Sequence, residues 1–197
     1  MYIFPLALSL DFSCGPLAAM ALDANHTIWI FESWGRPYQL ISPLLDCSSP
    51  ETTPIQIEQG LIFSAVLTRS GDVYVWSASM GGSEQYKGAM AKLDMDESTR
   101  AIVPDGGTVI PCHTWEMEVD PVKLPIPPNL PDLPMTGLPE EEHRKEIKFI
   151  KIVAINSGFV GLTSKGHVCL FEIDSNQIIT DPFSFVWSYV SDSAQMI

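Results

Sequence analysis

The clearest pattern of hydrophobic and polar positions in this chain lies in residues 67–76, LTRSGDVYVW. A polar stretch with one glycine separates Leu67 from four consecutive apolar residues, Val73 to Trp76. A strand with one solvated face alternates apolar and polar side chains, so this run predicts a strand that is covered on both faces. The polar stretch before it predicts a tight turn.

The same pattern occurs three times without a gap, as LDANHTIWIF (22–31), LTRSGDVYVW (67–76) and LTSKGHVCLF (162–171). Of the ten aligned columns, the first is always leucine, the seventh and ninth are aliphatic, and the tenth is aromatic. An apolar run precedes each copy, so each copy predicts a β-hairpin. We expect strands at 61–68 and 72–77 to pair, and strands at 158–163 and 167–172 to pair.

The fifth column holds Gly71 and Gly166 in the second and third copies. A short hairpin turn commonly needs one residue at positive φ, and glycine adopts this conformation without steric cost. We therefore predict both to be structural turn glycines with positive φ. In the first copy, Asn25 or His26 must take this conformation, which both residue types tolerate better than most.

The spacing of the copies indicates a β-propeller. His26 and Gly71 are 45 residues apart, and Gly71 and Gly166 are 95 residues apart. Repeats of this period with one hairpin each are typical of propellers, whose blades are covered by a neighbour on both faces. The longer interval then holds either a decayed copy or an insertion. A two-layer sandwich is the alternative, but it predicts one solvated face per strand.

We thus expect an all-β fold with little helix, namely a partial β-propeller of about three repeats that forms a single domain over residues 1–197. About three blades do not close a ring. The arc should expose an apolar blade face at each end, including aromatic residues such as Trp29, Trp76 or Phe171 where no neighbouring blade covers them. Such faces lead to self-association or to a partner that covers them.

Two segments between the second and third copies have a composition of their own. Residues 80–108 are rich in glycine and polar residues, which predicts a surface excursion. Residues 121–139 hold seven prolines, which exclude a central strand and favour extended polyproline II. We interpret them as a proline-rich insertion that connects blades. A Pro-x-x-P ligand for an aromatic groove, for example Pro128 to Pro131, is the alternative.

The net charge of −13 narrows the classes of partner. It argues against a nucleic-acid-binding protein, which needs clustered lysine and arginine, but it is compatible with a basic protein partner. No stretch is long enough to span a bilayer. The apolar N-terminus lacks the basic residues that begin a signal peptide, so we expect a location in the cytoplasm or nucleus. The four cysteines are far apart and are expected to be reduced.

No catalytic or metal-binding constellation is present in the sequence. Cys112 and His113 are the only close pair of potential zinc ligands, and one pair does not make a site. The sequence has no P-loop, no dinucleotide-binding glycine motif and no nucleophile elbow. Trp115 is expected in a strand with Glu116 and Glu118 on its solvated face. We therefore expect a protein that is not an enzyme and that uses no cofactor or metal.

The pattern Leu-Thr-x-x-Gly-x-Val-Tyr-x-Trp resembles the repeat of the regulator of chromosome condensation, which builds seven-bladed propellers. The resemblance covers all three copies, from Gly15 to about Ile173. Residues 33–76, 113–134 and 152–173 further resemble fungal F-box proteins of the SCF-associated-factor type. In that family, an F-box binds the Skp adaptor of a ubiquitin ligase and the propeller is thought to receive the substrate. No F-box is visible in this sequence.

The resemblance implies a non-enzymatic protein-interaction propeller that recognises substrates for an SCF-type ubiquitin ligase, with ligase subunits and a degradation substrate as partners. A guanine nucleotide exchange factor for a small GTPase is the alternative, as is a generic scaffold or a non-functional fragment. The loop residues Trp34, Arg36 and Tyr38 form an aromatic–arginine–aromatic cluster of the kind enriched at interface hot spots. They are the candidate protein-binding residues. Trp34 could instead simply pack against a blade edge.

Overall fold

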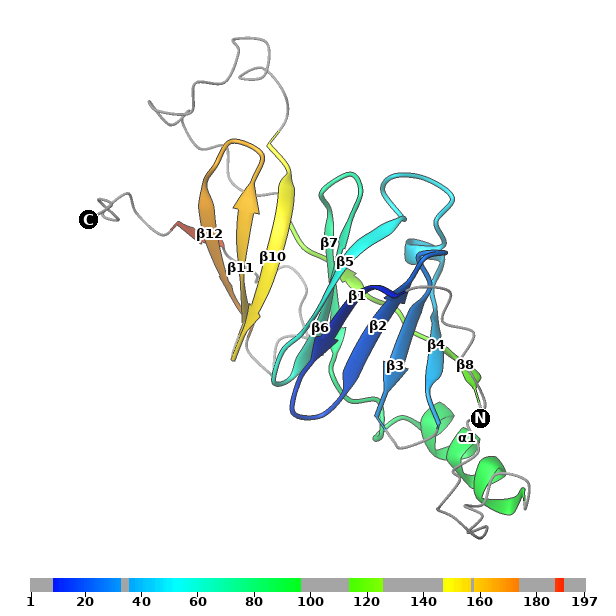
Figure 1. The fold of residues 1–197 in the computed structure, drawn as a ribbon. Coiled ribbons are helices and arrows are strands. Elements are labelled where there is room, and N and C mark those ends of the chain that lie inside the picture. The colour runs from blue at the N-terminus through cyan, green and yellow to red at the C-terminus, as the bar shows by residue number, and fades with distance from the viewer. Residues whose placement is uncertain are drawn as a thin grey trace, which may run out of the picture.

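The computed structural model describes residues 9–32, 36–96, 114–125, 147–156, 158–173 and 187–189. In this part of the chain three β-sheets stand side by side (Figure 1). The described residues also contain one α-helix of 12 residues, α1 (Glu84–Met95), and one short 3₁₀ helix, η1 (Pro43–Leu45). The fold is therefore mainly β with little helix, as the sequence predicts.

The first sheet has the strand order β1-β2-β3-β4-β8. Its strands are β1 (Ser9–Cys14), β2 (Ala19–Asp23), β3 (Ile28–Phe31), β4 (Tyr38–Ile41) and β8 (Trp115–Glu118). Strands β1 to β4 form an antiparallel meander, and β8 then pairs with β4 in parallel. The predicted strand at Trp115 is thus confirmed, and Glu116 and Glu118 are exposed on it.

The second and third sheets are antiparallel and have four strands each. The second contains β5 (Pro54–Gln59), β6 (Phe63–Thr68), β7 (Val73–Ser77) and β9 (Val122–Lys123). The third contains β10 (Phe149–Ile155), β11 (Gly158–Thr163), β12 (Val168–Glu172) and β13 (Trp187–Tyr189). The predicted hairpins are confirmed as β6–β7 and β11–β12. Three such consecutive sheets are the blades of a partial β-propeller.

The long interval between the second and third copies is filled by insertion as far as the structure describes it. Strands β7 and β9 are neighbours in the second sheet, although α1 and β8 lie between them in the sequence. No further repeat hairpin occurs in the described part of this interval. Strand β9 lies at the outer edge of its sheet and begins the proline-rich insertion, where proline excludes only a central strand.

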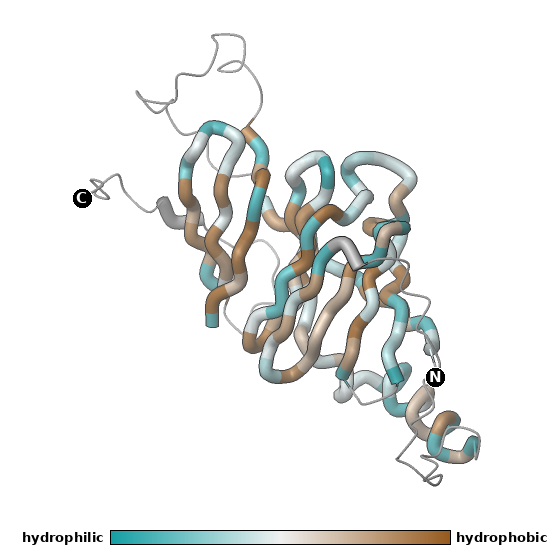
Figure 2. The backbone as a smooth tube through the Cα atoms, in the orientation of Figure 1, coloured by the Kyte–Doolittle hydropathy of each residue, from teal (hydrophilic) through white to brown (hydrophobic). Residues whose placement is uncertain are grey.

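The second sheet is covered on both faces, which explains the apolar run at Val73 to Trp76. We call the sheet face that carries columns one, seven and nine the forward face, and the face that carries columns eight and ten the backward face. Val73 and Val75 point forward into a core shared with the third sheet. Tyr74 and Trp76 point backward into a core shared with the first sheet. Hydrophobic positions accordingly line the strands, and hydrophilic positions gather at the β6–β7 and β11–β12 turns (Figure 2).

Within the predicted surface excursion at 80–108, residues 84–95 form the helix α1. Ser83 caps this helix, because its side chain accepts a hydrogen bond from the Tyr86 amide. Glu84 in the first turn and Lys92 in the last turn complement the helix dipole. None of its residues is buried, so local propensity and capping, more than packing, support the helix.

The expected exposure of aromatic residues at the ends of the arc is wrong for Trp76 and Phe171. Both are buried, because column ten faces the preceding blade, which is present for these two copies. Aliphatic residues are exposed instead on the forward face of the third sheet: Val153 is 48% exposed, Ile155 39% and Val168 40%. Trp29, on the backward face of the first sheet, is half-buried.

Candidate functional site

The three repeat turns share one set of hydrogen bonds. In each turn, the column-two amide donates to the column-six carbonyl, as from Thr68 to Asp72 at 2.9 Å and from Thr163 to His167 at 2.9 Å. The threonine hydroxyls in return accept from the amides of Asp72 and His167. Asp23 takes the place of threonine in the first turn. Figure 1 shows the turns β6–β7 and β11–β12 at the same end of the sheets. We call this end the turn face.

Column five has positive φ in all three turns, at 63° for His26, 95° for Gly71 and 85° for Gly166. These are the values that the sequence predicts for the two glycines. The first two of these residues also contact the next blade. The ring Nδ1 of His26 lies 2.7 Å from the carbonyl oxygen of Pro54. A Cβ atom at Gly71 would lie 2.8 Å from the carbonyl oxygen of Phe149.

A pocket of about 300 Å³ opens on the turn face where the second and third sheets meet. We call it the turn-face pocket. The β6–β7 turn lines one side, the start of the proline-rich insertion lines another, and the entry to β10 closes the third. Four charged side chains line it, namely Glu51, Asp72, Lys123 and Lys148. The pocket therefore combines segments that are far apart in the sequence.

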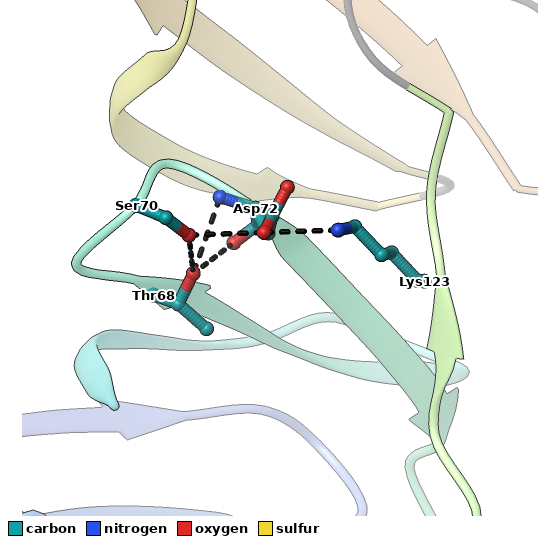
Figure 3. Close-up of polar contacts among 4 residues, drawn as sticks. All are labelled: Thr68, Ser70, Asp72 and Lys123. Atoms are coloured by element: carbon teal, nitrogen blue, oxygen red, sulfur yellow. Dashed lines mark hydrogen bonds and ion pairs between the residues drawn. The ribbon is translucent and has the colours of Figure 1, made fainter. Parts of the chain in front are cut away.

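Asp72 is the centre of the polar contacts in this pocket (Figure 3). Its carboxylate accepts a hydrogen bond from the Ser70 hydroxyl at 2.9 Å and lies 2.9 Å from the Lys123 ammonium. Lys123 also lies over the ring of Tyr74, 6.0 Å from its centroid. These contacts attach the short strand β9 to the repeat turn.

The charges of the pocket balance one another. Partial burial disfavours the charged form of Lys123, but the hydrogen bond and charge of Asp72, with Tyr74 and Glu51 nearby, outweigh it and raise its pKa. Hydrogen bonding from Ser49 lowers the pKa of Glu51, so this carboxyl remains ionised. Glu51 and Lys148 are both exposed at the rim.

This arrangement suits recognition of a polar protein segment. Exposed groups of both signs at the rim, Glu51 and Lys148, offer an acceptor and a donor to side chains of opposite sign. The interior pair of Asp72 and Lys123 is already engaged and fixes the shape of the pocket. Among the described residues, no group of three or more histidine, cysteine or acidic side chains is placed to hold a metal ion.

The candidate binding residues at the start of β4 behave differently from the expectation. Trp34 lies outside the described residues. Arg36 pairs with Asp94 of α1 at 2.6 Å, and its side chain is 24% exposed. Tyr38 is 1% exposed and donates a hydrogen bond to Glu32 at 2.6 Å, so its ring is not open to a partner. Burial, together with this bond, raises the pKa of the Tyr38 phenol. Arg36 is the member of the three that remains partly accessible on the described surface.

A second hollow, of about 500 Å³, lies between α1 and β8 near Arg36. Tyr38, Tyr86 and Trp115 form an aromatic cluster beside it, with ring centroids 4.9 Å apart for Tyr38 and Trp115. The pair of Arg36 and Asp94 thus holds α1 against the first sheet. Arg36 and Tyr38 thus both contact α1, Arg36 through Asp94 and Tyr38 through the ring of Tyr86.

Sequence reasoning missed the turn-face pocket. Asp72 and Lys123 are distant in the sequence and meet only because β9 returns to the edge of the second sheet. The one local signal was Asp72 itself. It places an acidic residue in column six, where the other two copies have Thr27 and His167.

No family model matches the sequence, and no curated protein matches it. Solved structures do match, among them human WBSCR16, with 16% identity over 82% of this chain and 33% of that chain, and a TM-score of 0.44. Yeast RCC1 (Prp20) bound to Kap60 matches with 14% identity over 82% and 31%, at a TM-score of 0.42. Prp20p from Saccharomyces cerevisiae, described with its binding to Gsp1p and histones, matches with 13% identity over 82% and 31%, at 0.39.

The chain spans about a third of the length of these structures. Two of them are yeast RCC1 (Prp20). The superpositions are loose, and the assignment as a partial propeller rests on the chain's own three sheets and repeated turns. No described helix is long and apolar enough to cross a membrane.

Proposed function

We propose that this chain is a protein-interaction module whose turn face recognises substrates for an SCF-type ubiquitin ligase, in the cytoplasm or nucleus. The turn-face pocket is the observation that carries this proposal. Loops on one face of a rigid β scaffold are the usual place for recognition, and here four separate segments meet around one opening. The sequence resemblance to F-box propeller proteins supplies the ligase context.

The rim charges define the partner segment. Glu51 suits a basic side chain and Lys148 an acidic one, so a segment with charges of both signs fits the pocket. The net charge of −13 favours a partner that is basic overall.

Affinity capture with charge variants tests the proposal. The full chain with Lys148→Glu and Glu51→Lys is compared with wild type and with Lys87→Glu, which changes an exposed lysine on α1. Proteins retained by wild type and Lys87→Glu, but lost from the double variant, are the candidate substrates. Their half-lives should lengthen when the proteasome is inhibited.

Two results would contradict this function. If the double variant retains every partner, the pocket is not the recognition site. If the lost partner is a small GTPase whose nucleotide exchange the chain accelerates, the exchange-factor alternative holds instead.

A further inference from the structure

The contact between consecutive blades contains a repeated polar link at their first strands. In the first and second sheets, two alternate side chains of the first strand accept hydrogen bonds from backbone amides. These amides belong to the first strand of the following sheet. Between the first and second sheets, Asp11 accepts from the Ile57 amide at 2.9 Å, and Ser13 accepts from the Gln59 amide at 2.9 Å. A neighbouring blade is thereby recognised through its backbone.

The same link joins the second and third sheets. The Gln56 side chain accepts from the Ile152 amide at 3.0 Å, and the Glu58 side chain accepts from the Ala154 amide at 3.2 Å. Gln56 occupies the register position of Asp11, since each lies opposite the column-one leucine of its own sheet. The link therefore follows the repeat.

In the third sheet, the equivalent positions hold Lys151 and Val153. Lysine has donors only and valine has no polar group, so neither accepts a hydrogen bond from a backbone amide. A further blade with the same backbone would leave two amides without acceptors at this contact. The forward face of the third sheet is thus built for a different occupant.

On its first three strands this face is a grid of three strands by three residues, and β13 continues it with Ser188 beside Leu170. The strand registers place Lys151, Val153 and Ile155 of β10 beside Leu162, Val160 and Gly158 of β11, and these beside Val168, Leu170 and Glu172 of β12. Lys151 and Glu172 are both exposed and occupy diagonally opposite corners. The residues between them are aliphatic or glycine.

We propose that this forward face is a self-association surface, on which a second copy of the chain packs face to face. A two-fold axis along the other diagonal of the grid brings Lys151 of each copy onto Glu172 of the other. The grid is oblong, because strands lie roughly 4.8 Å apart and alternate residues roughly 6.6 Å apart, and the charged corners still come within reach of their long side chains. The sheets then cross at roughly 70°, closer to the orthogonal than to the aligned packing of β-sheets. The contact is isologous, and each copy covers the exposed Val153, Ile155 and Val168 of the other.

Charge reversal in the full 197-residue chain tests this surface by sedimentation equilibrium. Wild type should form a reversible dimer at tens of micromolar. Lys151→Glu and Glu172→Lys should each weaken dimerisation about tenfold, because each creates two like-charge contacts per dimer. The double variant should regain the wild-type dimer. An equimolar mixture of the two single variants should form the mixed dimer in preference to either homodimer.

Val160→Glu, at the centre of the grid, should abolish the dimer. Burial raises the pKa of Glu58 and the charge of Lys151 opposes this rise, so the thermal midpoint of every variant is measured to show that its blades are intact. A wild-type monomer at these concentrations would overturn the proposal. So would a dimer that persists in Val160→Glu, or a double variant as weak as the single ones.

Discussion

The second and third sheets carry the same repeat and make the same turn, but they differ in what surrounds them. Thr68 and Thr163 accept equivalent hydrogen bonds, and Gly71 and Gly166 have nearly equal φ. The second sheet is nevertheless covered on both faces, whereas the third is covered on its backward face and exposes aliphatic residues on its forward face. One local pattern therefore makes both blades, and the neighbours decide how much each position contributes to stability.

The largest difference is expected in column nine, where Val75 is fully buried and Leu170 lies on the forward face of the third sheet. Val75→Asp should unfold the chain at ordinary temperature, because an unpaired buried carboxylate costs several kcal/mol. Leu170→Asp should keep the fold. Urea unfolding followed by circular dichroism compares the two. Equal loss of stability at a concentration where the chain is monomeric would mean that another part of the same chain covers the forward face of the third sheet.

The next largest difference in stability is expected between substitutions of the two turn glycines. Gly166→Ala should cost about 1–2 kcal/mol, the penalty for an L-residue in the left-handed region. Gly71→Ala should cost roughly 1–3 kcal/mol more, because its Cβ would lie 2.6 Å from the Cβ of Lys148 and 2.8 Å from the Phe149 carbonyl oxygen. Denaturation midpoints measure both values. Equal costs would show that the entry to β10 moves aside freely.

The turn threonines should show no such difference. Thr68→Val and Thr163→Val each remove the hydroxyl that accepts from the column-six amide. Each should cost about 1–3 kcal/mol, since the amide loses its acceptor, and the two values should lie close together, with Thr68 slightly the larger because its hydroxyl also lies 2.9 Å from the Ser70 hydroxyl. Thermal unfolding of both variants checks this, with exposed Ser79→Ala as a control. A much larger effect at Thr68 would mean that the turn depends on the pocket as well as on itself.

The smallest effect is expected at Glu58, in the link between the second and third sheets. Partial burial raises its pKa, despite the opposing hydrogen bond from the Ala154 amide. A carboxyl whose pKa is higher in the folded state favours folding at low pH, and this contribution is lost as pH rises above its ordinary value of 4.5. Glu58→Gln should therefore be neutral or stabilising by about 1 kcal/mol or less at pH 7. A stability curve flat with pH in wild type would contradict this.

The sequence was sufficient for features that depend on neighbours along the chain. Period-two apolar residues, a leucine before each turn and a glycine within it predicted the hairpins β6–β7 and β11–β12. The absence of alternation at Val73 to Trp76 predicted a doubly covered strand. These signals are local, because side-chain alternation and positive φ are set within a few residues.

The tertiary structure alone decided which distant residues meet. Asp72 meets Lys123 because β9 pairs with β7, and Arg36 meets Asp94 because α1 lies against the first sheet. Neither pair produces a periodic pattern in the sequence. Sequence reasoning therefore predicted Arg36 to be an interface residue, because it could not identify Asp94 as its partner. The same holds for Lys151 and Val153, which are ordinary strand residues in the sequence. Only the strand register shows that they occupy the positions of Gln56 and Glu58 and cannot accept the same hydrogen bonds. The physical reason is that a hydrogen bond requires the fold to place its donor opposite its acceptor.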